Sequence, residues 1–164
     1  MPVDSLKDEV MKIIREKQLS SVMNTTQWRA LQDAVKALPF PPPYQLKCVN
    51  IKAPSPEVFD RDVWYWGDWS DEALMPFYAI EWICVRPTYK THRGRLIDDA
   101  LIDETSEFVS ALDRHAIPYR TDNGAFFIYG YLNRQPTENS PHREASTGLT
   151  IWNRFKAYLS NRLS

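Results

Sequence analysis

Glycine and histidine are scarce in this 164-residue chain, and their scarcity argues against two classes of site. The five glycines stand apart and form neither phosphate-cradling pattern, GxGxxG or GxxxxGKS/T, which disfavours nucleotide chemistry. The three histidines, His92, His115 and His142, lie in separate polar regions without an HExxH or HxH motif. We therefore expect neither a metal nor a cofactor.

Cysteine is equally sparse, with only Cys48 and Cys84 in the chain. Each lies in an alternating apolar stretch without CxxC spacing, which is typical of small buried thiols and not of a disulfide or metal site. Neither follows a glycine-rich turn or a helix start that would activate it, and no GxSxG elbow is present. We therefore assign no catalytic residue.

Long apolar runs and an excess of one charge are also missing. The 20 basic and 21 acidic residues leave a net charge of −1, which argues against broad nucleic-acid binding. The apolar stretches are a few residues long, whereas a membrane span needs about 20. Because the N-terminal residues also lack the apolar block of a signal peptide, we expect a cytoplasmic protein with no membrane contact.

Aromatic residues, by contrast, are plentiful, with six Trp, eight Tyr and seven Phe. Such a composition favours a packed core over a disordered chain. The order of predicted helices and strands lacks the βαβ alternation of doubly wound folds. We expect one α+β domain over residues 1–164, with an antiparallel or mixed sheet of four to five strands and helices packed on one side.

Apolar periodicity and caps place the predicted helices. Asn24 and Gln27 have the spacing of a capping box, and Pro39 and Pro118 end helical patterns. The predicted helices cover residues 4–18, 24–38, 103–115 and 149–159. The polar stretch 133–148 is expected to be a flexible excursion.

Strands are predicted where apolar residues alternate or run together. Residues 76–85 read as a central strand, because their apolar run is broken only by Glu81. The Asn123-Gly124 step supplies the turn of a tight hairpin. Further predictions are a strand over 44–52, a hairpin over 117–132, a rigid Pro-rich connector over 39–43, and loops over 53–62 and 86–95.

The acidic residues are unevenly distributed. Residues 57–81 hold seven acids and one base, 82–95 hold four bases and no acid, and 96–107 hold five acids and no base. If the two acidic stretches share a face, it combines aromatic anchors with a charged rim and suits a basic protein partner. The partner-binding residues predicted on this basis are Asp60, Asp62, Tyr65, Asp68, Trp69, Asp71, Glu72, Asp98 and Asp99.

Two interpretations of the tryptophans at 64, 66 and 69 stay open. Aromatics at the alternating positions Trp64 and Trp66 fit a half-buried strand, and this favours packing of all three into the core. The alternative is that one aromatic residue, such as Trp69 or Tyr65, is exposed and anchors a partner.

Four segments carry a resemblance to a known family, namely residues 24–31, 62–70, 80–83 and 128–131. They include an N-x-T-x-W motif at Asn24 and a W-x-W-G-D-W-S motif at Trp64. Together they resemble an uncharacterised bacterial family of small cytoplasmic proteins, a resemblance that implies no established catalytic residues. In its size, local acidity and expected lack of cofactors, the chain also resembles the immunity proteins of polymorphic toxin systems.

Three functional hypotheses follow, and we rank binding above catalysis. The first is an immunity protein that occludes a basic toxin domain through the acidic and aromatic residues. The second is a small hydrolase or transferase around the WYWGDW loop, using Asp68, Glu81, His92 or Arg93. The third is a regulator with weak nucleic-acid contact through the basic loop, whose charged residues are Lys90, His92, Arg93 and Arg95.

Overall fold

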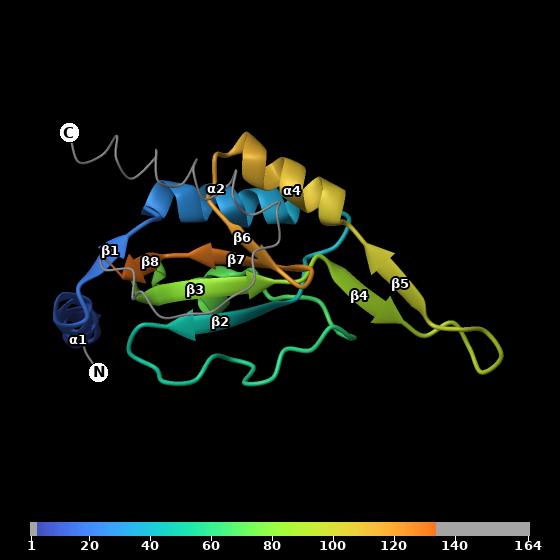
Figure 1. Cartoon of the computed structure of the whole chain (residues 1–164), viewed down its shortest axis with the longest axis horizontal. Helices are drawn as coiled ribbons and strands as arrows, with labels where there is room; N and C mark the ends of the chain where they lie inside the picture. The colour runs from blue at the N-terminus through green and yellow to red at the C-terminus, as the bar shows by residue number, and fades with distance from the viewer. Residues whose placement is uncertain (1–2, 134–164) are drawn as a thin grey trace.

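A four-stranded antiparallel sheet forms the centre of the fold in the computed structural model, which describes residues 3–133 (Figure 1). Its strands lie in the order β2 (Tyr44–Cys48), β3 (Ile80–Val85), β7 (Ala125–Tyr129) and β6 (Arg120–Asp122). Two further pairs of strands are also antiparallel. The α+β class is therefore confirmed, with all three sheets antiparallel.

Two helices, α2 (Thr25–Lys36) and α4 (Thr105–Arg114), lie side by side over one face of this sheet (Figure 1). Both are amphipathic, and their apolar stripes supply buried side chains to one core together with the inward-facing residues of the sheet. This core includes Trp28, Leu31, Val35, Phe108 and Leu112 from the helices, and Ile83, Val85, Phe126 and Ile128 from the strands.

The predicted capping box begins α2. The Asn24 side chain accepts a hydrogen bond of 2.8 Å from the Gln27 backbone N–H, and the Asn24 N–H donates one of 3.0 Å to the Gln27 side chain. The helix ends at Lys36, two residues before the predicted end.

A second, smaller cluster lies at one end of the sheet. Here α1 (Val3–Glu16) packs through Val10 against Val49 and Ala79. The helix predicted over 4–18 is thus confirmed. The neighbouring pair of β1 (Leu19–Ser21) and β8 (Tyr131–Asn133) was not predicted as a sheet, because three-residue strands are too short to show alternation.

The predicted hairpin between β6 and β7 is confirmed. Asn123 and Gly124 have φ angles of +49° and +78°, the positive values that a two-residue turn of this kind requires. The central strand is also confirmed, but it begins at Ile80, because residues Phe77–Ala79 form the 3-10 helix η1.

The loop predicted over 86–95 is wrong in part, because β4 (Thr88–Thr91) lies within it. This strand pairs with β5 (Ala100–Asp103), and the resulting two-stranded ribbon projects from one end of the main sheet (Figure 1). The sequence of β4, TYKT, has no apolar alternation, so the pattern search could not find it.

A short helix, α3 (Asp71–Leu74), follows the tryptophan-rich stretch. The helix predicted over 149–159 lies outside the described residues, as does the polar excursion apart from Asn133. Among residues 3–133, no helix is both long and apolar enough to cross a membrane.

Candidate functional site

The Pro-rich connector provides a docking strip for the tryptophan-rich stretch. The Gly67 N–H donates to the Pro41 carbonyl at 3.1 Å, and the Trp69 indole Nε1 donates to the Pro42 carbonyl at 2.8 Å. The Tyr44 hydroxyl donates to the Asp68 carbonyl from the adjoining strand. Proline carbonyls remain free to accept hydrogen bonds although proline lacks a donor, so this connector fixes the path of residues 67–69.

Trp69 is therefore a core residue. Its side chain is only 5% exposed and packs edge-to-face with Tyr44 at 4.8 Å between ring centroids. The prediction that Trp69 contacts a partner is wrong, because its indole is occupied by the connector and by the core.

Trp64 and Trp66 have the opposite placement. They are 52% and 56% exposed, and Tyr65 between them is exposed as well. Val63 is buried, as is Trp69, so both ends of the stretch are anchored while residues 64–66 face solvent. We call residues 64–66 the aromatic segment. Packing of Trp64 and Trp66 into the core was expected and is wrong, because this stretch forms no strand.

The ribbon, defined as residues 88–103, lies beside the aromatic segment. The Lys90 N–H donates to the Val63 carbonyl at 2.7 Å, and the Lys90 ammonium pairs with Asp62 at 2.9 Å. The Trp66 ring meets Tyr89 of β4 edge-on at 5.9 Å. These contacts join the aromatic segment and the ribbon into one surface, which we call the binding surface.

Large apolar side chains are exposed on both faces of the ribbon. Leu101 and Ile102 are consecutive residues of β5, so they point to opposite faces, and both are exposed. Leu96 in the turn is 99% exposed, and Ile97 beside it is also exposed. The sequence contains a signal of this exposure, because Leu96 and Ile97 lie between charged residues, Arg95 on one side and Asp98 on the other.

The predicted acidic residues contact different parts of the structure. Asp62 pairs with Lys90 in the binding surface, and Asp99 pairs with His92 at 2.9 Å in the ribbon. Asp60, shortly before the aromatic segment in the chain, and Asp98, in the turn of the ribbon, are exposed. Because Asp62 has a cationic partner and Asp99 is hydrogen-bonded to His92, this surface is less acidic than the sequence count suggested.

Asp68 and Asp71 have structural partners of their own. Asp68 accepts a hydrogen bond from the Ser70 N–H at 3.0 Å, and its pKa is lowered by the bonds from Ser70. Asp71 accepts from the Gln32 amide at 2.9 Å and from Arg29 at 2.6 Å, bonds that lower its pKa. Asp71 therefore helps to fix the loop on α2, while Asp68 stabilises the turn before α3.

The Gln32 amide completes this arrangement. Its side chain is fully buried and also donates to the Trp69 carbonyl at 2.7 Å. Glu72 follows as an exposed residue in the first turn of α3.

Glu104 is a buried acid that the sequence reasoning did not single out. One carboxyl oxygen, Oε2, accepts from the Phe40 N–H at 3.2 Å, while Oε1 has no hydrogen-bond partner within residues 3–133. Burial raises the pKa of Glu104 to about 7, more strongly than the bond from Phe40 lowers it. An acid just before a helix is ordinarily an exposed cap, so its burial gave no sequence signal.

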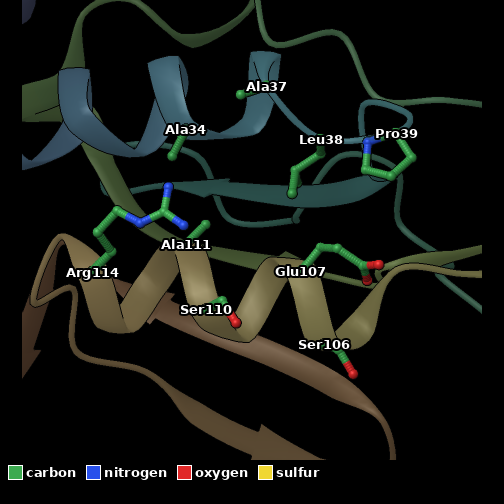
Figure 2. A pocket seen from close by; sticks show the side chains of 9 residues that line it. All are labelled: Ala34, Ala37, Leu38, Pro39, Ser106, Glu107, Ser110, Ala111 and Arg114. Carbon is green, nitrogen blue, oxygen red and sulfur yellow. The ribbon is translucent and has the colours of Figure 1, made fainter.

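A cavity of about 430 Å³ lies between the end of α2 and α4 (Figure 2). Its walls are mainly small side chains such as Ala34, Ala37 and Ser110, and its charged lining residues are Glu107 and Arg114. None of its lining residues belongs to the binding surface.

The residues named for a hydrolase or transferase do not converge. Glu81 pairs with Lys47 at 2.8 Å on the main sheet, whereas His92 pairs with Asp99 in the ribbon. In Figure 1 the start of β3, which contains Glu81, and the turn of the ribbon lie at opposite ends of the fold. Within residues 3–133, no three metal-binding side chains cluster.

Three of the residues named for nucleic-acid contact have partners within the protein, and one of these partners, Asp62, neutralises the charge of Lys90. Lys90 and His92 each pair with an aspartate, and the Arg93 guanidinium donates to the Asp98 carbonyl at 3.3 Å. This basic group offers less free charge to a phosphate backbone than its sequence suggested.

Comparisons with known proteins give a family and no function. A search of curated proteins and a search of solved structures found no match for the chain. One family model matches residues 10–135, which include every strand between residues 3 and 133 and all of α2, α3 and α4. The chain belongs to DUF6678, a family of unknown function.

Proposed function

We propose that this chain is a protein-binding protein whose partner covers the binding surface. The observation that supports this most directly is the exposure of Trp64 and Trp66 between two buried anchors, Val63 and Trp69. Tryptophan and tyrosine residues dominate the binding energy of many protein interfaces, and a fixed backbone reduces the entropy lost on binding.

The ribbon supports the same proposal. A two-stranded ribbon is only marginally stable in water unless a further strand or a packed face supports it. Here the ribbon exposes Leu101 on one face and Ile102 on the other. A partner that covers the ribbon would bury these apolar side chains, and burial of apolar surface favours association.

The more specific form of the proposal is an immunity protein that acts in the cytoplasm by occluding a toxin domain. The exposed acids Asp60, shortly before the aromatic segment in the chain, and Asp98, in the turn of the ribbon, suit a basic partner and would speed its association. The proposed action is occlusion and requires no catalytic residue of this chain.

Co-expression with the product of the neighbouring open reading frame tests this function. The expected result is a stoichiometric complex and restored growth of cells in which that product alone is toxic. A folded chain that forms no complex and gives no protection would contradict the immunity role. Charge-reversal variants at Asp60 and Asp98 test the role of the acidic residues in binding. Reversal at Asp71 is unsuitable, because it would also break the bonds of Asp71 to Arg29 and Gln32.

A further inference from the structure

The outer edge of β5 is open within the part of the chain that the structure describes. β5 pairs with β4 on one side, and none of the strands between residues 3 and 133 pairs with its other side. The edge of β4, by contrast, is held by the hydrogen bond from Lys90 to Val63. An open edge presents unpaired backbone groups that can template another strand.

The hydrogen bonds of β4 identify which groups of β5 face outward. The Lys90 N–H points away from β5 toward Val63, so Lys90 and its partner Leu101 form a non-hydrogen-bonded pair. The Glu104 N–H donates to the Pro87 carbonyl at 2.9 Å, so Glu104 and Pro87 form a hydrogen-bonded pair. Hydrogen-bonded and non-hydrogen-bonded pairs alternate along an antiparallel pair of strands. The pairs of Leu101 with Lys90 and of Asp103 with Thr88 are therefore both non-hydrogen-bonded, and the backbone groups of Leu101 and Asp103 point to the open edge.

The charge beside this edge is acidic. Residues 96–103 include Asp98, Asp99 and Asp103 and no base. A second copy of this chain paired antiparallel on β5 would bring Asp103 of each copy near Asp99 of the other, which is unfavourable. An incoming strand with lysine or arginine at its ends would meet these aspartates with opposite charge.

We infer that the partner binds by adding an extended strand to the outer edge of β5, and that this strand has alternating apolar side chains and basic residues at its ends. This inference rests on the proposed function and specifies how the partner would be recognised. Main-chain bonds to Leu101 and Asp103 give affinity, and contacts with the exposed side chains of Leu101 and Ile102 give specificity.

Two synthetic peptides and the full chain provide the test. The probe is Lys-Val-Thr-Val-Thr-Val-Lys with a fluorescent label, and its control is the same peptide with glutamate at both ends. We expect the lysine peptide to bind roughly tenfold or more tightly than the glutamate peptide. No binding of the lysine peptide, or equal affinity for the two peptides, overturns the inference.

Substitutions at Leu101 separate the backbone from the side chain. Leu101→Pro removes the outward N–H at an edge position where proline is tolerated, while Leu101→Ala shortens the side chain and keeps the N–H. Leu101→Pro should bind the lysine peptide roughly tenfold more weakly than Leu101→Ala. Equal binding by the two variants contradicts strand addition.

A charge variant keeps the test decisive if Leu101→Pro fails to fold. Asp98→Lys changes an exposed side chain and should weaken binding of the lysine peptide, whereas the matched variant Asp113→Lys on α4 should not. Equal effects of the two variants contradict the charge assignment. Sedimentation of the wild-type chain as a dimer that Leu101→Pro dissociates would assign the edge to a second copy instead.

Failure of this inference can be told apart from failure of the proposed function. If the co-expressed complex forms and is unaffected by Leu101→Pro, the binding function stands and strand addition is wrong. If no complex forms although the lysine peptide binds through Leu101, the edge is a strand acceptor and the immunity role is wrong.

Discussion

The indole of Trp69 donates its hydrogen bond to the carbonyl of Pro42, 27 residues earlier in the chain. This bond joins the two most unusual stretches of the sequence, the Pro-rich connector and the WYWGDW loop. The loop is thereby fixed at Trp69 while Trp64 and Trp66 stay exposed. The same contact thus explains both the burial of one tryptophan and the presentation of the other two.

Trp69→Phe should destabilise the fold by about 1–3 kcal/mol, because the buried Pro42 carbonyl loses its donor. Urea denaturation measures the free energy of unfolding. Trp64→Phe is the matched control and should lie within about 0.5 kcal/mol of the wild type, because Trp64 is exposed. Equal effects of the two substitutions would show that the bond to Pro42 is unimportant.

Gly67→Ala should lower the free energy of unfolding by about 1–3 kcal/mol or prevent folding, because the added methyl group overpacks the contact with the connector. A Cβ at Gly67 would lie 2.2 Å from the Pro42 carbonyl oxygen, and neither backbone can move away cheaply. At Gly124, where φ is +78°, a Cβ meets nothing within 4 Å, so Gly124→Ala should cost only about 1–2 kcal/mol. Thermal denaturation of both variants tests the difference, and a neutral Gly67→Ala variant would contradict the docking.

Stability should fall as pH rises, through the titration of Glu104. Its pKa in the folded protein is about 7, above the ordinary value of 4.5. Between pH 4.5 and pH 7 the native state therefore binds more protons than the unfolded state. Glu104→Gln removes this titration. Its free energy of unfolding should therefore increase by up to about 3 kcal/mol relative to that of the wild type as pH rises from 4 to 8.

Denaturant titrations across this pH range provide the measurement. Asp113→Asn is the control, since it removes an exposed acid of the same helix that does not contribute to the raised pKa of Glu104. A constant difference in stability between Glu104→Gln and the wild type at every pH would argue against a raised pKa for Glu104.

Both cysteines should react slowly with iodoacetamide at pH 8 in the folded protein. Burial raises the pKa of Cys84 to about 11 and also raises the pKa of Cys48, so the reactive thiolate is scarce. Mass spectrometry of the alkylated chain, with and without urea, measures the protection. Rapid labelling of folded protein would contradict this burial.

Local signals made much of the fold predictable from the sequence. The capping box at Asn24, the Asn123-Gly124 turn and the apolar run of β3 each depend on a few neighbouring residues, and each is confirmed. Cys84 is buried, as predicted, whereas Cys48 is only half-buried.

The candidate site was harder to predict, because long-range contacts decide it. Nothing in the sequence near Trp69 distinguishes it from Trp64 or Trp66, and its burial depends on contacts with Pro42 and Tyr44, more than 20 residues earlier in the chain. The ribbon was missed because β4 is half-buried along its whole length and β5 is mostly exposed, so neither strand has the alternation of buried and exposed residues that marks a strand in sequence.

Affinity capture with matched surface variants tests the central claim most directly. The full chain is used as bait beside Trp64→Ser/Trp66→Ser in the binding surface and Ile51→Ser/Val58→Ser, which removes exposed apolar residues elsewhere. We expect a stoichiometric partner that the wild type and the control variant retain and that the tryptophan variant recovers roughly tenfold less well. Equal recovery of that partner by all three baits would contradict the claim that the aromatic segment binds it.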